Sequence, residues 1–305
     1  MGNLSGTILI IKDGGDSFEK YVNKTMLDYG IDVLTWQDIV PLNHSFLEKL
    51  ILSIKSILKL KKQNNLKTYK KVVVFEHTGI TVLLSLLTNI KRKNLILWIW
   101  NTKEKKEIKF VNWIYPFCRI FTFDQQQAKK YNWEYNTQFF LWPNYTASSN
   151  NGTAFFVGKN KNRLDLLNEI AKHLIKANIQ CDFNILVLNN ANKDLIKDEW
   201  KISKMISYEE VLDKSSKCSV IVDIVKEGQS GLTLRVLEAL FFGKKLITNN
   251  KNICTCDFYR SDNVFIVGVD NWDDFEMFLG SELLQIPNNV KNKYLLETWV
   301  NNFDS

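Results

Sequence analysis

The sequence is poor in proline and glycine, and it has neither a long apolar segment nor a paired-cysteine pattern. Four prolines and thirteen glycines in 305 residues argue against a disordered or low-complexity chain. No run of about 18 apolar residues occurs, so no segment is expected to span a bilayer. The five cysteines are odd in number, and Cys254 and Cys256 stand too close for an ordinary disulfide. This pattern predicts that the protein resides in a reducing cytoplasm. The first strand-like run begins near Thr7 without a charged and apolar leader, so no secretory signal is expected.

Common metal-binding and phosphate-binding motifs are also missing. The sequence contains no HExxH, no pair of CxxC motifs and no GxxxxGK followed by serine or threonine. We therefore expect a chain without a metal centre or another cofactor.

What the sequence does contain is an alternation of apolar, strand-like runs and amphipathic, helix-like runs, which predicts an α/β fold. Runs such as 72–75 and 95–100 are continuously apolar, as expected for parallel strands covered by helices on both faces. A first series has strands near 7–12, 31–36, 71–76, 94–100, 119–123 and 137–142, and helices near 17–29, 45–62, 79–91, 104–117 and 124–132. A second series has strands near 153–157, 181–188, 218–224, 245–248 and 264–267, and helices near 163–177, 208–216 and 231–242.

A polar stretch separates the two series. Residues 146–152 carry no aromatic or charged side chain, which makes them the best candidate linker. We expect two Rossmann-like domains, at 1–145 and 146–288, and a helical segment at 289–305.

The most informative segment joins an apolar run at 218–225 to a turn of sequence EGQSG and then to an amphipathic helix. The free amides and the positive dipole end at a helix N-terminus favour a bound anion. Ser230 is placed to cap this helix, and the glycines of the turn let a ligand approach the backbone. Gly231, Arg235 and Glu238 are spaced by four and three, which puts them on one helical face. An ordinary βαβ unit with Arg235 and Glu238 as a solvated ion pair remains the alternative.

The run QSGLTLRVLEAL from Gln229 to Leu240, followed by GKKLIT, resembles the donor-binding segment of GT-B glycosyltransferases. More narrowly, it resembles bacterial enzymes that build lipopolysaccharide and capsular polysaccharide. The resemblance implies two Rossmann-like domains facing each other across a cleft. In this family a C-terminal segment such as 289–305 often crosses back to the first domain. The resemblance also implies that Arg235 neutralises the departing diphosphate and that Glu238 binds the ribose hydroxyls. The other donor-binding residues in this run are Gln229, Ser230, Gly231, Leu232 and Thr233.

Two further loops of the second domain share the resemblance. Gly158, Lys159 and Arg163 match the family's first loop of this domain, where a basic residue reaches the donor phosphates. Surface charges at a helix start are the alternative for these two cations, although the helix dipole disfavours them there. The resemblance places the nucleotide base near Met205 and Ile206.

In the first domain, the chemistry is expected at the ends of the first, third and fourth strands, where such folds bind ligands. The residues at these ends are Asp13, Gly14, Gly15, Asp16, Glu76, His77 and Asn101. The carboxylates and the histidine are candidate bases for an acceptor hydroxyl, with Asp13 and His77 preferred. A simple helix cap at Asp16 and a structural histidine at His77 remain alternatives.

No two aspartates are spaced D-x-D, the pair with which GT-A glycosyltransferases hold a divalent metal. The resemblance thus implies a metal-independent reaction, in which Arg235, Lys159 or Arg163 and the helix N-terminus meet the leaving-group charge. Many retaining GT-B enzymes carry a glutamate eight positions before the one matched by Glu238, where this chain has Ser230. The stereochemical course therefore stays open.

The net charge of +7 lies in the first half of the chain. Residues 1–150 contain 21 basic and 12 acidic side chains, a net +9, whereas residues 151–305 contain 19 and 21, a net −2. The helical run at 45–62 combines large apolar residues with lysines, as in helices that lie on anionic membranes. The same helix packed on its own sheet, with its lysines in water, is the alternative. The first domain is in either case the predicted membrane-facing one.

Together these observations predict a cytoplasmic, peripheral-membrane hexosyltransferase. It would move a sugar from a nucleotide-diphosphate donor, preferably a UDP-sugar, to a hydroxyl of a glycan or lipid-linked glycan in surface-polysaccharide synthesis. An inactive sugar-nucleotide-binding subunit is one alternative, because the upstream glutamate is missing. A nucleic-acid-binding protein is another, but most aromatic residues lie in apolar strands and no recognition motif occurs, so no nucleic-acid partner is predicted.

Overall fold

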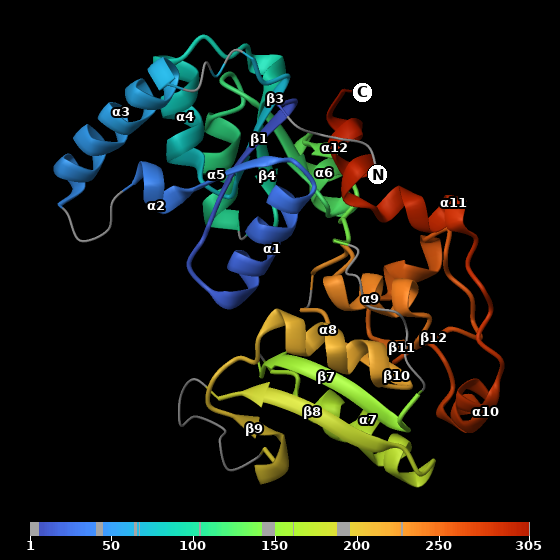
Figure 1. Ribbon diagram of the computed structural model, residues 1–305. Helices are drawn as coiled ribbons and strands as arrows, with labels where there is room; N and C mark the ends of the chain where they lie inside the picture. The colour runs from blue at the N-terminus through green and yellow to red at the C-terminus, as the bar shows by residue number, and fades with distance from the viewer. Residues whose placement is uncertain are drawn as a thin grey trace. The chain divides into compact units, whose positions relative to one another are not determined.

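The computed structural model describes residues 6–40, 45–63, 66, 68–103, 105–141, 150–160, 162–187, 196–226 and 228–304. The chain forms two compact units (Figure 1). Unit 1 comprises residues 1–137 and 296–305, and unit 2 comprises residues 138–295. The boundary that the sequence suggests, at 145/146, and most of the proposed linker lie outside the described residues.

Unit 1 contains a six-stranded parallel sheet in the order β2-β1-β3-β4-β5-β6. Its strands are β1 Ile8–Lys12, β2 Asp32–Thr35, β3 Lys71–Phe75, β4 Leu95–Ile99, β5 Arg119–Thr122 and β6 Glu134–Tyr135. Its helices are α1 Ser17–Asp28, α2 Trp36–Ile39, α3 Phe46–Gln63, α4 Thr78–Leu87, α5 Lys105–Trp113, α6 Gln125–Tyr131 and α12 Leu296–Asn301. The strand order reverses between β1 and β3, which are neighbours in the sheet, so the loops after these two strands flank the switch point.

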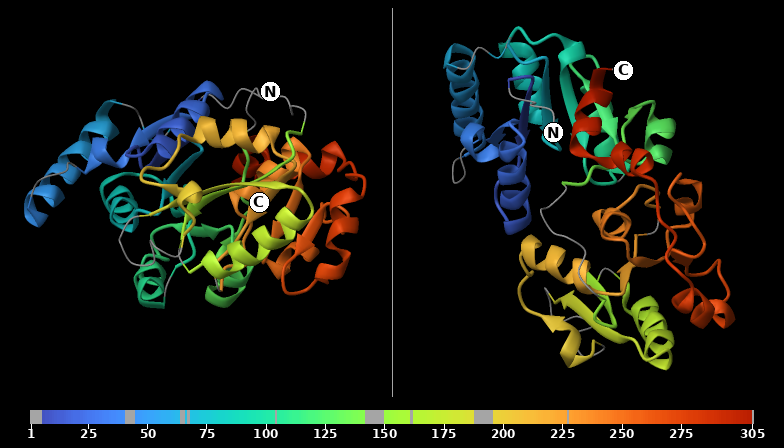
Figure 2. Two further views of the ribbon diagram at one scale, coloured as in Figure 1. Left: turned by 90° about the horizontal axis from the view of Figure 1, so that it is seen from below. Right: turned by 45° about the vertical axis from the view of Figure 1, so that its right-hand side comes forward.

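Both faces of this sheet are covered, which is why its central strands are continuously apolar. One face packs on α2 to α5 through residues such as Ile57, Leu84 and Ile108. The other face receives the C-terminal segment, where the ring of Trp299 lies 5.2 Å from that of Trp98. In the right-hand view of Figure 2 the C-terminal end of the chain (red) lies against the sheet of unit 1. Of the strand predicted at 137–142, the described residues 137–141 form no strand beyond a single bridge between Phe140 and Leu295, and β6 ends at Tyr135.

Unit 2 contains a second six-stranded parallel sheet in the order β12-β11-β10-β7-β8-β9. Its strands are β7 Thr153–Lys159, β8 Gln180–Leu186, β9 Lys201–Ile202, β10 Val220–Asp223, β11 Lys245–Thr248 and β12 Val264–Ile266. Its helices are α7 Leu164–Lys176, α8 Tyr208–Lys217, α9 Leu234–Phe242, α10 Phe275–Gly280 and α11 Asn288–Lys291. This is the doubly wound Rossmann order, and its switch point lies between β7 and β10.

The predicted fold class, α/β with two Rossmann-like sheets, is therefore confirmed at the level of each unit. The hydrophobic core of unit 2 shows why the predicted elements form. Helix α7 turns Leu167, Ile170 and Leu174 onto the sheet at helical spacing, where they meet Phe156 and Phe183.

Candidate functional site

In unit 2, the predicted donor residues gather at the switch point between β7 and β10. Gly158 and Lys159 end β7, and Arg163 directly precedes α7. A Cβ atom on Gly158 would lie 3.3 Å from a terminal nitrogen of Arg163, so the glycine leaves room for that guanidinium. Lys159 is exposed, whereas Arg163 is half-buried and burial lowers its pKa. Among the described residues, the buried Nε atom of Arg163 has no hydrogen-bond acceptor.

Asp223, at the end of β10, is the centre of this cluster, and it is absent from the sequence-based site. Its carboxylate is buried and accepts hydrogen bonds from Thr233 Oγ1, at 2.8 Å, and from Thr248 Oγ1, at 3.3 Å. Burial raises the pKa of Asp223, and the hydrogen bond from Thr233 and the charges of Arg163 and Arg235 oppose that rise. An acidic residue at the end of a fully apolar strand was the signal that could have revealed it.

Arg235 and Glu238 form an ion pair, but a buried rather than a solvated one. A terminal nitrogen of Arg235 lies 2.5 Å from Glu238 Oε2, and the Glu238 side chain is 0 % exposed. Tyr208 donates a hydrogen bond to Glu238 Oε1, at 3.0 Å, and Ser215 donates one to Oε2, at 2.8 Å. Burial raises the pKa of Glu238 to about 7, with Arg235 as the main opposing charge.

This burial bears on the predicted contact between Glu238 and a ribose. In this structure the carboxylate has no surface to offer a ligand, and its two oxygens hold Arg235, Tyr208 and Ser215. Glu238 thus orients the arginine that faces the switch point. The guanidinium of Arg235 also lies 5.9 Å from the centre of the Tyr208 ring.

The glycine turn differs from the sequence-based expectation at the helix start. Helix α9 begins at Leu234, and its cap is Thr233, whose hydroxyl accepts from the amide of Val236. Ser230 is therefore not the cap, and Gly231 lies before the helix rather than on the face of Arg235. Ser230 instead accepts a hydrogen bond from Asn250 through its carbonyl.

The remaining residues of the donor segment divide by exposure. Gln229 and Ser230 are half-buried, whereas Gly231 and Leu232 are buried. Met205 is exposed and Ile206 half-buried, just before α8. Tyr208, two positions after Ile206, connects the start of α8 to Glu238 by its hydrogen bond. Glu227, the first residue of the predicted turn, lies outside the described residues.

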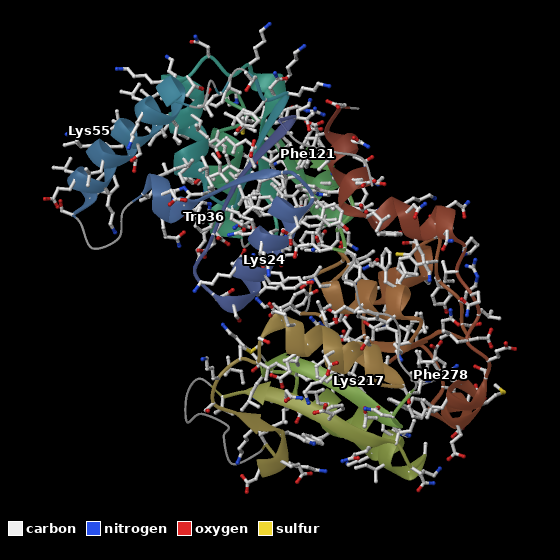
Figure 3. All side chains as sticks on the ribbon, in the orientation of Figure 1. Lys24, Trp36, Lys55, Phe121, Lys217 and Phe278 are labelled. Carbon is white, nitrogen blue, oxygen red and sulfur yellow. The ribbon has the colours of Figure 1, made fainter. Side chains whose placement is uncertain are left out.

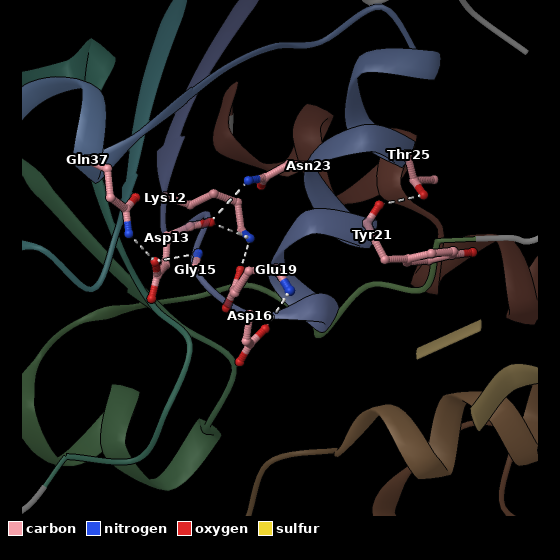
Figure 4. Close-up of polar contacts among 9 residues, drawn as sticks. All are labelled: Lys12, Asp13, Gly15, Asp16, Glu19, Tyr21, Asn23, Thr25 and Gln37. Atoms are coloured by element: carbon pink, nitrogen blue, oxygen red, sulfur yellow. Dashed lines mark hydrogen bonds and ion pairs between the residues drawn. The ribbon is translucent and has the colours of Figure 1, made fainter. Parts of the chain in front are cut away.

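In unit 1, a polar cluster surrounds the loop after β1 (Figure 4). Asp13 Oδ1 accepts hydrogen bonds from the amide of Gly15, at 2.9 Å, and from Gln37 Nε2, at 2.8 Å. Burial raises the pKa of Asp13, but these hydrogen bonds and one from the Gly14 amide outweigh it and leave the pKa below its ordinary value. A Cβ atom on Gly14 would lie 2.6 Å from the Thr35 methyl group, so any other residue there would require Thr35 to shift.

Lys12, the last residue of β1, contacts this loop and is likewise absent from the sequence-based site. Its side chain is buried, forms an ion pair with Glu19 and approaches the Asp13 carbonyl, to which Asn23 Nδ2 donates at 3.1 Å. Burial lowers the pKa of Lys12 to about 7, against the raising charges of Asp13 and Asp16. Asp16 caps α1 by accepting from the amide of Glu19, so the capping alternative describes it.

His77 and Glu76 are occupied by structural contacts after β3. The Nδ1 atom of His77 accepts from the amide of Ile80, at 3.1 Å, and burial lowers the pKa of His77. A neutral imidazole that accepts at Nδ1 carries its proton on Nε2, so this tautomer can donate to a ligand but cannot take its proton. Glu76 accepts from the amide of Asn101, at 2.6 Å, and pairs with Lys103. Among the described residues, Asp13 and Asp16 are thus the base candidates whose Oδ2 atom accepts no hydrogen bond, and Asp16 already serves as the cap of α1.

Metal ligands do not cluster in the described ranges: no three His, Cys, Asp or Glu side chains there come together as a metal-binding group. Of the helices that the structure describes, not one reaches the length and hydropathy of a membrane span.

Several solved structures share this architecture, although no protein-family model and no curated protein matches the chain. The glycosyltransferase AviGT4, involved in avilamycin A biosynthesis, superposes with a TM-score of 0.55 at 11 % identity, covering 98 % of this chain and 97 % of its own. Sucrose-phosphate synthase from Thermosynechococcus elongatus gives the same values. The N-terminal domain of trehalose-6-phosphate phosphatase from Candida albicans gives 0.52 at 10 % identity, covering 100 % and 97 %.

The fold is GT-B. At such low identity these likenesses establish the fold alone. Unit 2 contains the cluster of Arg163, Asp223 and Arg235, and unit 1 contains the Asp13 loop.

Proposed function

We propose that this protein is a glycosyltransferase that binds a nucleotide-diphosphate sugar at the switch point of unit 2. The observation that carries the proposal is the convergence of Arg163 and Arg235 on the buried Asp223. Glu238 holds the guanidinium of Arg235 by an ion pair, and the charges of Arg163 and Arg235 both act on the buried Asp223. This cluster lies at the carboxyl edge of a Rossmann sheet, the place where such sheets bind nucleotides. The exposed Lys159 adds a positive charge that no carboxylate in the cluster balances.

This arrangement suits the leaving group of sugar transfer. As the acceptor oxygen bonds to the anomeric carbon, the bond from that carbon to the diphosphate breaks and negative charge grows on the phosphate. Cations that are already oriented stabilise that charge without reorganisation. We propose that Arg235, Arg163 and Lys159 supply this stabilisation and that the reaction needs no metal ion.

The acceptor hydroxyl must lose a proton, and Asp13 in unit 1 is the proposed base. Its Oδ1 is held by Gln37 and Gly15, which leaves Oδ2 for the acceptor. We further propose that the donor is a UDP-sugar and that a hexosyl group is transferred to a glycan or lipid-linked glycan. The reaction would serve surface-polysaccharide synthesis on the cytoplasmic side of the membrane.

A thermal-shift screen against UDP-, GDP-, dTDP-, ADP- and CMP-linked sugars tests the donor site. A ligand at about a hundred times its Kd should add about 2.7 kcal/mol of stability. Lys159→Ala should reduce the shift without changing the unliganded melting temperature, because this side chain is exposed. Lys172→Ala, an exposed lysine on α7, is the matched control. A chain that none of these donors stabilises would contradict the proposal.

An inactive sugar-nucleotide-binding subunit is the second candidate, favoured by Ser230 at the upstream glutamate position and by the burial of Glu238. Release of free nucleotide diphosphate in the presence of acceptor separates the two. Donor binding without such release would favour the inactive subunit.

A further inference from the structure

Helix α3 leaves most of its large apolar side chains exposed. Within residues 46–62 only Ser53 and Ile57 are buried. The exposed apolar side chains are Phe46 at 81 %, Leu47 at 69 %, Ile51 at 51 %, Leu58 at 40 % and Leu50 at 39 %. The helix therefore does not use most of its apolar residues to pack against its own sheet.

Four of these residues and the half-buried Ile54 form a continuous stripe, which we call the α3 stripe: Leu47, Leu50, Ile51, Ile54 and Leu58. At about 100° per residue they fall within an arc of roughly 100°, over about 16 Å of helix. The side that packs on the unit, through Ser53 and Ile57, lies next to this arc rather than within it. Among the described residues, Ile54 is the only member of the α3 stripe that is not exposed, and it is half-buried.

Lysines border the stripe. Lys55, Lys59 and Lys62 are exposed and lie along one side of the arc, and Glu48 is the only acidic residue in the helix. Figure 3 labels Lys55 on α3, at the outer edge of unit 1.

The C-terminal end of the helix is joined to α4 by a hydrogen bond from Lys61 Nζ to the Leu87 carbonyl. Further exposed cations follow α4: Lys91, Arg92 and Lys93.

We propose that the α3 stripe docks on an anionic lipid bilayer. The apolar side chains enter the boundary between headgroups and acyl chains, and the flanking lysines meet lipid phosphates. Charge complementarity favours lipid over a protein partner, because lysine is depleted at protein interfaces, where arginine and aromatic residues are enriched. Membranes instead attract clusters of lysine beside an apolar helix face. This inference does not depend on sugar transfer.

Vesicle flotation with the full chain tests the proposal. The vesicles are phosphatidylcholine alone and phosphatidylcholine with about 30 mol% phosphatidylglycerol. The stripe variant carries Leu47→Gln, Ile51→Gln and Leu58→Gln, and the charge variant carries Lys55→Gln, Lys59→Gln and Lys62→Gln. The control variant carries Val269→Gln and Met277→Gln, two exposed apolar residues of unit 2.

The protein and the control variant should float with the anionic vesicles and bind neutral vesicles at least tenfold more weakly. The stripe and charge variants should each lose at least tenfold in binding to anionic vesicles while keeping the original melting temperature. Three results would overturn the proposal: no flotation of the unaltered protein, flotation of the stripe variant at the original level, or a self-associating protein that binds no vesicles and becomes monomeric in the stripe variant. Turnover with a soluble acceptor is measured separately, so failed catalysis and failed lipid binding are distinguishable.

Discussion

Asp223 and Thr233 are joined by a hydrogen bond of 2.8 Å that ties the end of β10 to the start of α9. The same Thr233 oxygen accepts from the Val236 amide and so caps the helix. One hydroxyl thus satisfies a buried carboxylate and a free helix amide together. The relationship fixes where α9, and with it Arg235, stands relative to the sheet.

Thr233→Ala should remove both interactions. We expect a loss of about 1–2 kcal/mol in the free energy of unfolding, the usual cost of losing a cap and leaving a buried acceptor short of one donor. Chemical denaturation measures it. Thr233→Ser keeps the hydroxyl and should retain most of the stability; equal losses in both variants would mean that the methyl group, not the hydroxyl, matters.

Arg235→Ala should cost stability as well as donor binding, because it leaves Glu238 buried without its cation. We expect a loss of up to about 3 kcal/mol at pH 8. The double variant Arg235→Met with Glu238→Gln removes both charges and should recover part of this stability while remaining unable to bind the donor. A double variant no more stable than Arg235→Ala would show that the charge left behind is not the cause.

Glu238 should make stability depend on pH. Its pKa rises from 4.5 to about 7 on folding, so the folded state binds the proton more tightly than the unfolded state. The stabilisation is full below pH 4.5 and is lost as the pH rises to about 7, by about 3 kcal/mol in all. Denaturation of the unaltered protein and of Glu238→Gln across this range isolates the effect. Parallel curves for the two proteins would show that Glu238 does not titrate there.

Gln37→Met should make the carboxylate form of Asp13 less favourable. Without the hydrogen bond from Gln37 the pKa of Asp13 rises, so the acidic limb of the pH profile of kcat/KM should move upward by about half to one pH unit. Gln125→Met, at an exposed position on α6, is the control. An unmoved acidic limb in Gln37→Met would remove Asp13 as the base.

Trp299→Ala tests how much unit 1 depends on the C-terminal segment. Trp299 is 0 % exposed and packs on Trp98, Phe75 and Phe303, so the variant should lose about 3–5 kcal/mol. Asn301→Ala, exposed in the same helix, should lose almost nothing. Similar melting temperatures for both variants would show that unit 1 is complete without α12.

Local sequence pattern by itself determined much of this protein. Apolar runs such as 95–99 became buried parallel strands, since a strand covered on both faces needs apolar residues at every position. The alternation of strands and helices indicated two Rossmann-like sheets. The glycine turn before α9 identified the edge of unit 2 that carries Arg163 and Arg235, because short-range geometry places a helix start after such a turn.

Only the tertiary structure decided which of these groups meet. Asp223 and Arg163 stand sixty positions apart in the sequence, and no spacing rule links them. Periodicity alone leaves Glu238 on an open helical face, but Tyr208 and Ser215 of another helix bury it. The periodicity of α3 likewise predicts an apolar face without saying whether a neighbour covers it. Burial depends on contacts between elements that are far apart in the sequence, and a local pattern contains no information about such contacts.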